Sequence, residues 1–505
     1  MQKVAVGNAE NYIVSPLTRR TSAVQIKNIS RRLLAGTCLI LTDLAGVIIA
    51  LLIAYQIRLR VLPTIFPIFP HESPPQLSVK IWWILGLIFI CLAYERLYTR
   101  RLPFWRETKK IIAVINLSFI MIFAGVSLAK LGGEVSRTVL VLGYIFALIL
   151  IPLDRYLLKS IMAVLGIWQE YVLILGTDST ARKIAAVLNK DNYMGYRIYG
   201  FLGNSSGARG KIRVNAERIP VYGGFEDAER ILKETGIQQV IIAAPTIAGK
   251  KLVHLTHQLQ PYTRSILVVP DLCGIPVIDG ETEYFFEDHI LGFRTHNNLA
   301  NPINVWGKRL FDIVVGSIIL IGVLPVLAVI AAAIKLDSPG PVGFSHRRVG
   351  HNGNYFNLYK FRSMVANSQE LLEDLLRQDP ELKEEWEGDF KLKDDPRITR
   401  VGRFLRKTSL DELPQIFNVI KGDMSLVGPR PIVEEEIDKF DEYIKEYYMV
   451  LPGITGLWAV SGRNDIEYDE RVQMETWYVR NWSLWLDISL LFRTIPVVLG
   501  KKGAY

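Results

Sequence analysis

Cysteine is scarce in this sequence. The 505 residues include three, Cys38, Cys91 and Cys273, and no two of them have the spacing of a metal-binding or redox motif. A fold held together by disulfides is therefore excluded, and a chain that faces the cytoplasm is favoured. A signal-peptide cleavage pattern is also lacking before the first apolar run, so we expect that run to be retained as a helix.

Acidic residues are fewer than basic ones, whereas apolar residues are abundant. The chain has 59 Lys and Arg against 50 Asp and Glu, half of its residues are hydrophobic, and its mean hydropathy is +0.21. Excess positive charge suits nucleic acid, an anionic membrane or a phosphorylated substrate. The apolar runs favour the last two, and we do not expect nucleic acid as a partner. At about 150 residues per domain, the length suggests three domains.

Four apolar runs predict an N-terminal transmembrane domain of four helices within residues 1–160. A helix needs about 20 apolar residues to cross a bilayer. The second and fourth runs are shorter, so they must include flanking residues. The runs are Leu33–Ile57, Ile81–Tyr94, Ile111–Ala129 and Thr138–Leu153.

The distribution of cations orients these helices. Arg and Lys cluster before the first run and between the second and third, and Arg155 and Lys159 follow the fourth. The loops 61–77 and 130–137 contain fewer cations. The positive-inside rule therefore places the N-terminus and everything after residue 154 in the cytoplasm. A buried helical hairpin is the alternative, which the alternation of charge disfavours.

Residues 168–292 alternate short apolar strands with helices, which predicts a cytoplasmic Rossmann-like α/β domain with a parallel sheet. After the first strand, Gly176 begins a turn where a dinucleotide fingerprint would lie. Asp178 replaces the second glycine, and its charge opposes a pyrophosphate, so we favour a regulatory or dimerising module. The predicted strands are Tyr171–Leu175, Arg197–Leu202, Val240–Ala244 and Ser265–Val269, and the helices include Ala181–Asn189 and Phe225–Thr235.

A polar stretch, 293–305, is predicted to be a linker before a further apolar run, Leu310–Ile334. Pro325 inside that run removes a backbone hydrogen bond and kinks a helix. Cations flank both ends, which disfavours a span that would put the rest of the chain outside. We therefore predict a re-entrant helix that enters and leaves the membrane by the cytoplasmic face. A straight span is the alternative.

The stretch 335–463 contains cations interleaved with Gly and Pro turns. Arginine forks bind phosphate oxygens, and glycine turns let backbone amides approach an anion. This pattern predicts a phosphate-binding site. The cations are Lys360, Arg362, Arg397, Arg406, Arg430 and Arg463.

Two adjacent carboxylates, Asp411 and Glu412, come just after the basic residues Arg403, Arg406 and Lys407. If Ser409 caps a helix here, both acids lie in its first turn, where the helix dipole and the cations favour the ionised form. An ionised carboxylate can attack phosphorus or bind Mg²⁺. An ordinary solvated helix start is the alternative, and composition alone does not identify a reaction.

From 305 to 500 the sequence resembles the bacterial polyprenyl-phosphate hexose-1-phosphate transferases, the monotopic phosphoglycosyl transferase family. The N-terminal helices and the α/β domain resemble the long-form members. Residues 461–466 and 477–487 are most similar to the undecaprenyl-phosphate galactose phosphotransferases. The motifs that carry the resemblance are Asp337–Val342, Arg347–Gly350, Tyr359–Met364, Asp395–Arg397, Arg403–Gln415, Lys421–Pro431 and Pro452–Gly456.

The resemblance implies a mainly α-helical catalytic domain, residues 305–505, on the cytoplasmic side of the bacterial inner membrane. Asp411 would attack the β-phosphate of a UDP-hexose, galactose in the first place, and release UMP. Undecaprenyl phosphate would then accept the phospho-sugar, which begins the synthesis of a surface polysaccharide. Glu412, together with Asp411, would bind Mg²⁺. A homodimer is also implied.

The resemblance assigns further residues to the site. Arg406 and Arg430 would contact phosphate, Arg463 and Glu475 would contact substrate, and Lys360 and Arg362 are further candidates. Lys308, Arg309 and Asp312 would anchor the re-entrant helix and help to receive the lipid phosphate. The family often has Ser-Pro at the helix break, where this chain has Leu324 and Pro325. A break is still expected, but a bend assisted by serine is not.

Two other functions are the alternatives to this one. A membrane-bound nucleotide-sugar dehydratase or epimerase needs a Tyr-x-x-x-Lys pair, and none occurs in 168–292. A non-catalytic scaffold of a polysaccharide export complex has no need of Asp411 and Glu412 among arginines.

Overall fold

The structure is a computed structural model of the whole chain. It describes residues 23–69, 82–130, 136–203, 210–270 except 246 and 248, 281–285, 290–294, 297–378 except 366, 395–462 and 466–499. These residues form two compact units, one within 1–271 and the other within 272–505. The first contains the N-terminal helices and an α/β sheet, and the second contains the acid pair.

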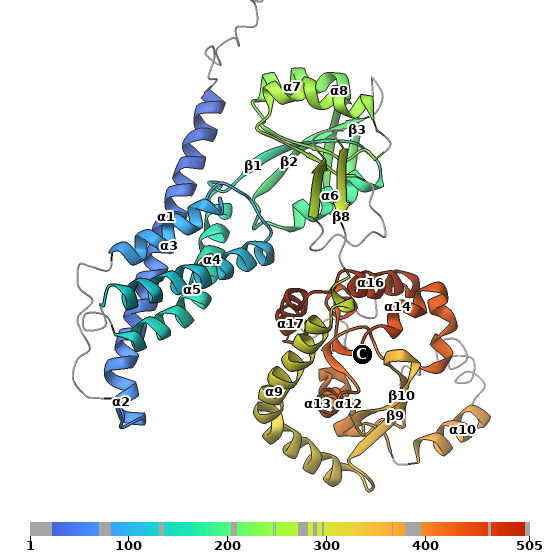
Figure 1. Ribbon diagram of the computed structural model, residues 1–505. Helices are drawn as coiled ribbons and strands as arrows, with labels where there is room; N and C mark the ends of the chain where they lie inside the picture. The colour runs from blue at the N-terminus through green and yellow to red at the C-terminus, as the bar shows by residue number, and fades with distance from the viewer. Residues whose placement is uncertain are drawn as a thin grey trace, which may run out of the picture. The chain divides into compact units, whose positions relative to one another are not determined.

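The N-terminal helices contain the four predicted apolar runs (Figure 1). Three stretches, Ser30–Ile65, Phe104–Leu128 and Arg137–Val164, are long and apolar enough to cross a membrane. The second predicted span is described over 13 residues, shorter than the roughly 20 that a bilayer needs, and residues 70–81 lie outside the described part. The elements are α1 (Ala23–Gln56), the π-helix η1 (Ile57–Val61), α2 (Leu62–Ile65), α3 (Trp82–Tyr94), α4 (Phe104–Leu128) and α5 (Arg137–Val164).

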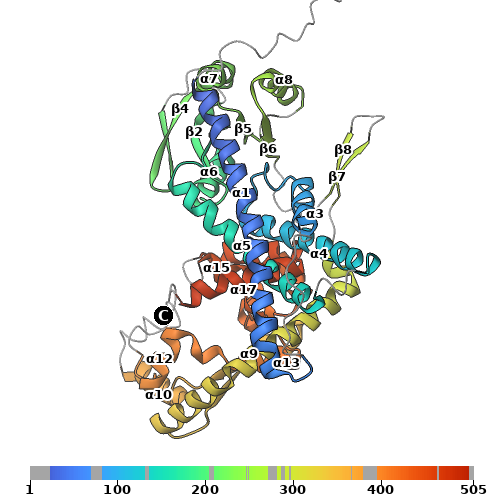
Figure 2. The same ribbon diagram turned by 90° about the vertical axis from the view of Figure 1, so that its left-hand side faces the viewer.

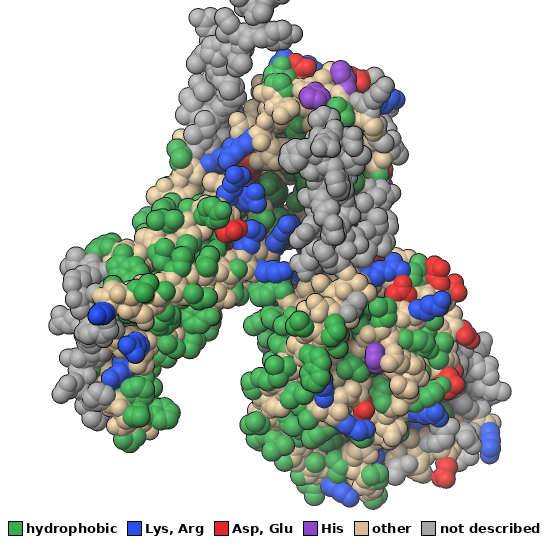
Figure 3. Space-filling model, in the orientation of Figure 1, with side chains coloured by type: hydrophobic (Ala, Val, Ile, Leu, Met, Phe, Trp, Pro, Cys, Tyr) green, Lys and Arg blue, Asp and Glu red, His purple; other side chains and the backbone are tan. Residues whose placement is uncertain are grey.

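These helices share an apolar core and also have an apolar outer surface. Leu92 and Ile115 are fully buried in the core. Leu41, Ile120 and Ile149 on the outside are each at least 60% exposed. Figure 3 shows hydrophobic side chains covering the visible face of these helices. Water-soluble surfaces rarely carry such an apolar patch, whereas lipid accepts it, so this is a membrane protein.

A buried network of ion pairs joins three helices of the bundle. Arg155 of α5 donates to both carboxylate oxygens of Asp43 in α1, at 2.8 and 2.6 Å, and to Glu107 in α4, at 2.6 Å. Lys159, one turn further along α5, pairs with the other oxygen of Glu107. The prediction that Arg155 and Lys159 are loop cations is therefore wrong. Both are buried because two acids from other helices compensate their charge.

The α/β sheet has the strand order β3-β4-β2-β1-β5-β6. The four predicted strands are confirmed and are parallel to one another, but β3 and β4 were missed. Lys211 and Arg213 in β3 interrupt the apolar pattern, as is typical of a sheet edge. The elements are β1 (Glu170–Leu175), α6 (Ser179–Lys190), β2 (Tyr196–Gly203), β3 (Gly210–Val214), β4 (Glu217–Gly224), η4 (Phe225–Asp227), α7 (Ala228–Thr235), β5 (Gln239–Ile242), α8 (Lys250–Leu259), η5 (Gln260–Tyr262) and β6 (Ser265–Val268).

Helices cover both faces of this sheet, α6 on one and α7 with α8 on the other (Figures 1 and 2). Alternate residues of β1 supply the two cores: Ile174 packs towards α6, and Leu175 towards α7 and α8. At the turn after β1, Asp178 accepts the backbone N–H of Ala181 at 3.1 Å and caps α6. Its carboxylate therefore occupies the helix N-terminus that a bound pyrophosphate would need.

In its described residues, the second unit is mainly α-helical, with three two-stranded sheets. Its elements are β7 (Glu281–Phe285), β8 (Ile290–Arg294), η6 (Asn298–Ala300), α9 (Pro302–Asp337), β9 (Gly343–Val349), η7 (His351–Gly353), β10 (Tyr355–Phe361), α10 (Ser368–Gln378), α12 (Arg400–Thr408), η8 (Leu410–Glu412), α13 (Gln415–Lys421), β11 (Ser425–Val427), η9 (Glu434–Glu436), η10 (Asp438–Tyr443), α14 (Ile444–Tyr448), β12 (Gly453–Thr455), α15 (Leu457–Ser461), α16 (Tyr468–Arg480) and α17 (Leu484–Leu499). The predicted linker 293–305 is wrong in its second half, because Asn298 bonds to the carbonyl of Trp482 and α9 begins at Pro302.

Helix α9 packs on this unit by one face along both of its halves. Before Pro325, Phe311 and Val315 pack against an apolar cluster that includes Val419 of α13. After Pro325, Ile330 belongs to an apolar cluster that includes residues of α12 and β10. The opposite face is apolar and exposed, and the helix changes direction midway (Figures 1 and 3). A helix apolar enough for a bilayer is thus attached lengthwise to a folded unit.

We expect Arg155→Met to destabilise the helix bundle by about 3–5 kcal/mol, because it leaves Asp43 without its buried partner. The measurement is the apparent Tm of the detergent-solubilised chain. The control is Arg137→Met, which removes an exposed arginine from the same helix. Equal Tm values for the two variants would contradict the proposed role of the buried pair.

Candidate active site

The acid pair lies in a short 3-10 helix, η8, between α12 and α13. Ser409 ends α12 with φ 54°, in the left-handed region, and its side chain caps neither helix. The prediction that Ser409 caps a helix is therefore wrong in its detail. Asp411 and Glu412 do lie in the first turn that follows, as predicted.

Two cations act on the acid pair. Lys360 on β10 bonds to Glu412, with 2.6 Å between its Nζ and the carboxylate Oε1. Arg406 on α12 donates to the hydroxyl of Ser363 at 2.9 Å, and its charge acts on Asp411. Three separate segments thus meet at the acid pair. Lys360, which the resemblance gave as a further candidate, therefore makes a direct contact with the pair.

The pKa of Asp411 is raised above its ordinary value. Burial is the main cause and the neighbouring charge of Glu412 the next, while Lys360 and Arg406 act in the opposite direction. The expectation that helix dipole and cations favour the ionised form is therefore incomplete, because desolvation outweighs them. A less solvated carboxylate is also a more reactive one once it is ionised.

Asn418, which the sequence analysis missed, fixes β10 against α13. Its side chain is fully buried, accepts the N–H of Tyr359 at 3.0 Å and donates to the carbonyl of Asn357 at 2.7 Å. A single asparagine in a helix carries no signal in the sequence. The contact sets where Lys360 approaches Glu412, because Lys360 follows Tyr359 on the same strand.

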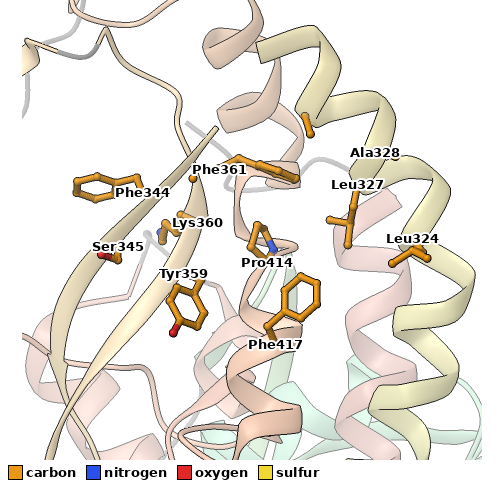
Figure 4. A pocket seen from close by; sticks show the side chains of 12 residues that line it. Leu324, Leu327, Ala328, Phe344, Ser345, Tyr359, Lys360, Phe361, Pro414 and Phe417 are labelled. Carbon is orange, nitrogen blue, oxygen red and sulfur yellow. The ribbon is translucent and has the colours of Figure 1, made fainter. Parts of the chain in front are cut away.

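A cavity of about 560 Å³ lies beside the acid pair, between α9, the β9–β10 ribbon and the start of α13. Figure 4 shows Leu324 and Leu327 of α9 on one side and Tyr359 and Phe361 of β10 on the other. Lys360 and Pro414 complete the wall nearest the acids, since Pro414 follows Glu412 by two residues. The cavity is therefore apolar over most of its surface and ends near charge.

A second group of polar side chains surrounds Arg430. Its backbone N–H donates to Glu475 at 3.2 Å, and its guanidinium lies over the ring of Trp458. Glu475 is 2% exposed, and through this hydrogen bond it fixes the backbone of Arg430 from inside the unit. Several buried polar atoms here lack a hydrogen-bond partner among the described residues, namely Arg348 Nε, Trp458 Nε1, Arg471 Nε and Glu475 Oε2.

Burial gives Glu475 an unusual carboxyl group. Burial raises the pKa of Glu475 to about 7 from an ordinary 4.5, although the charges of Arg471 and Arg430 lower it. Glu436 also faces the group and raises the pKa slightly. Glu475 therefore titrates near neutral pH.

The residues predicted at the start of α9 point into the unit. Lys308 pairs with Asp487 at 2.7 Å, and Arg309 donates to the carbonyls of Val419 and Ile420, at 2.6 and 2.8 Å. Asp312 accepts the N–H of Leu426 at 3.1 Å. These contacts attach α9 to the unit. Because Lys308 and Asp312 are buried, their receipt of a lipid phosphate stays a prediction without geometric support.

The remaining candidates bond to groups other than the acid pair or lie outside the described residues. Arg362 is buried and donates to the carbonyls of Ser338 and Pro339, which holds the end of α9. Arg397 forms a buried two-point pair with Asp395. Arg463 lies outside the described residues.

Residues 303–501 match the bacterial sugar transferase family, and residues 94–270 match a family described as a CoA-binding domain. The chain is 43% identical to the undecaprenyl-phosphate galactose phosphotransferase of Salmonella typhimurium, over 85% of this chain and 90% of the relative.

This chain belongs to the bacterial sugar transferase family. Two further relatives also match almost end to end. The UDP-galactose-lipid carrier transferase of Erwinia amylovora is 37% identical over 90% of this chain and 96% of the relative. The UDP-glucose:undecaprenyl-phosphate glucose-1-phosphate transferase of Xanthomonas campestris pv. campestris is 29% identical, over 92% and 93%. The family resemblance stated from the motifs is confirmed.

We expect Glu475→Gln to flatten the pH dependence of stability. A pKa raised on folding stabilises the folded chain fully below about pH 4.5, and this contribution is lost as the pH rises through 7. The loss amounts to about 3 kcal/mol. The measurement is the apparent Tm between pH 5 and 8, with Glu470→Gln on the exposed face of α16 as control. Parallel Tm profiles of the wild type and Glu475→Gln would contradict the assignment.

Proposed function

We propose that this chain transfers hexose-1-phosphate from a UDP-hexose to undecaprenyl phosphate and releases UMP, as the first membrane step of a surface polysaccharide. The observation that carries the proposal is the near end-to-end match to a relative named for this reaction, with Asp411 and Glu412 beside Lys360 and Arg406. Galactose is the favoured sugar because two relatives that match over most of their length are named for galactose.

The first step is attack by Asp411 on the β-phosphorus of the UDP-hexose. A bond forms between the carboxylate oxygen and phosphorus, the bridging P–O bond of the diphosphate breaks, and UMP leaves with the electron pair. Arg406 offers positive charge where the phosphoryl oxygens become more negative. In the second step, a phosphate oxygen of the dianionic acceptor attacks the same phosphorus, and Asp411 leaves as a carboxylate.

The acids also fit a magnesium ion. Mg²⁺ binds through one or two carboxylates and substrate phosphates, and Asp411 and Glu412 supply two adjacent carboxylates. The ion would neutralise charge on the diphosphate. Lys360 holds Glu412 in place by the 2.6 Å contact. No cluster of three acidic, histidine or cysteine ligands occurs among the described residues, so the substrate would complete the coordination.

The polar cluster around Arg430 is where we place the rest of the donor. Trp458 offers a ring and an N–H that no described residue accepts, and Arg348 and Arg430 offer positive charge. Glu475 keeps Arg430 in position through its backbone rather than touching the substrate. Arg463 and Arg362 stay as predicted substrate contacts that await a test.

Helix α9 supports a re-entrant arrangement. Both of its halves contact the same folded unit, which cannot lie on both sides of a bilayer. Pro325 lies between the halves. We therefore place the acid pair at the cytoplasmic surface of the bacterial inner membrane, with the Rossmann-like domain on the same side. The homodimer is a further part of the proposal, and its molar mass in detergent tests it.

We expect Asp411→Asn to abolish UMP release from UDP-galactose, because an amide cannot attack phosphorus. The measurement is UMP formed by the full chain with undecaprenyl phosphate and Mg²⁺. The control is Asp469→Asn, an exposed acid on α16. Wild-type turnover by Asp411→Asn would remove the nucleophile from the account, and turnover with UDP-glucose alone would correct the sugar.

We also expect both ends of α9 to be accessible from the cytoplasmic side only. Single cysteines at Asn304 and Pro341, in a chain whose three native cysteines are replaced by serine, should react with a membrane-impermeant maleimide in inside-out vesicles but not in spheroplasts. Labelling of the two positions from opposite sides would show a straight span and contradict the re-entrant helix.

A further inference from the structure

We propose that the cavity between α9, β10 and α13 holds the first isoprene units of the polyprenyl phosphate acceptor, with its phosphate directed towards Lys360. The inference rests on the proposed function and assigns a location to its lipid substrate.

The lining of the cavity suits an apolar chain. Leu324, Leu327 and Ala328 form one wall, and Phe361 and Phe417 form parts of the others (Figure 4). A volume of about 560 Å³ lies in the range of sites for drug-sized ligands, enough for a few isoprene units but far too small for the whole lipid. The remaining isoprene units would therefore stay in the bilayer.

The mouth of the cavity is continuous with the surface that we place in lipid. Leu324 lines the cavity and is 55% exposed, and Val326 and Val329 beside it are exposed on the apolar face of α9. A polyprenyl chain can therefore enter sideways from the membrane without passing through water. An apolar cavity that opened to water would offer no such route.

The opposite end of the cavity is lined by a charged side chain. Lys360 lines the wall, and its ammonium group contacts Glu412. Leu410 and Leu413, which flank the acid pair, pack against the cluster that contains Leu327. An acceptor with its chain in the cavity therefore presents its phosphate to Lys360 and to the phospho-sugar on Asp411. Lys360 and Arg406 together supply the positive charge that this anion needs beside Asp411 and Glu412.

The alternative position, at the start of α9, offers less accessible cations. Lys308 is paired with Asp487 and its side chain is 9% exposed, and Arg309 is bonded to two carbonyls of α13. Lys360 is also paired, with Glu412, but its side chain is 27% exposed and lines the cavity. The cavity and Lys360 account for the apolar and the anionic parts of the acceptor together.

The test fills the cavity and measures the two half-reactions separately. Ala328→Trp and Ala331→Phe project into it, whereas Val329→Trp adds the same bulk to the lipid-facing side of the same helix. For the full chain in nanodiscs, we expect the KM for undecaprenyl phosphate to rise about tenfold in the first two variants, a loss of about 1.4 kcal/mol in binding. The KM for UDP-galactose and the burst of UMP without acceptor should stay at wild-type values, which also shows that the variants fold.

Equal acceptor KM values for Ala328→Trp and Val329→Trp would overturn the inference. Loss of the UMP burst in the cavity variants alone would overturn it too, because the cavity would then serve the donor. A photoreactive polyprenyl phosphate should label residues 324–331, with competition by undecaprenyl phosphate but not by phosphatidylglycerol; equal competition would make the cavity a general lipid site. Absence of any UMP burst in the wild type would instead contradict the proposed function.

Discussion

The attachment of α9 to the acid-bearing unit is the constraint on which the rest of the structure depends. An apolar helix such as α9 would separate from the polar surface of the unit and move into lipid unless specific contacts attached it to the unit. Lys308 with Asp487, and Arg309 with the last carbonyls of α13, provide such contacts inside the unit, where breaking one leaves an uncompensated charge. Helix and acids therefore belong to one body. In the re-entrant arrangement that we propose, the depth of α9 in the membrane would therefore set the height of Asp411 above it.

Electrostatics at the acid pair follow from this position. A carboxylate near an apolar cavity loses hydration, and its pKa rises. Lys360 and Arg406 restore part of the lost stabilisation without neutralising Asp411 by a direct ion pair, since Lys360 bonds to Glu412. In the mechanism that we propose, Asp411 attacks phosphorus. Glu412 is bonded to Lys360 on the strand that also lines the cavity, which links the acid pair to the apolar site beside it.

The sequence predicts elements where periodicity and composition carry the signal. The apolar runs, the four parallel strands and the acid pair were found because each is a local pattern. What failed depends on contacts between distant segments. Arg155 looks like a loop cation until Asp43 and Glu107, on two other helices, are placed beside it. Ser409 looks like a helix cap, but its left-handed backbone ends α12 instead. The roles of Asn418 and Ser363 also come from distant contacts, since Asn418 on α13 bonds to β10 and Ser363, just after β10, accepts from Arg406 on α12.

A covalent intermediate on Asp411 is the most direct test of the proposed mechanism. The full chain incubated with UDP-galactose and Mg²⁺, without a lipid acceptor, should gain the mass of one galactosyl phosphate. Fragmentation should locate that mass on the peptide that contains Asp411, and addition of undecaprenyl phosphate should remove it. An adduct on another residue, or steady turnover with no adduct under rapid quench, would contradict the account.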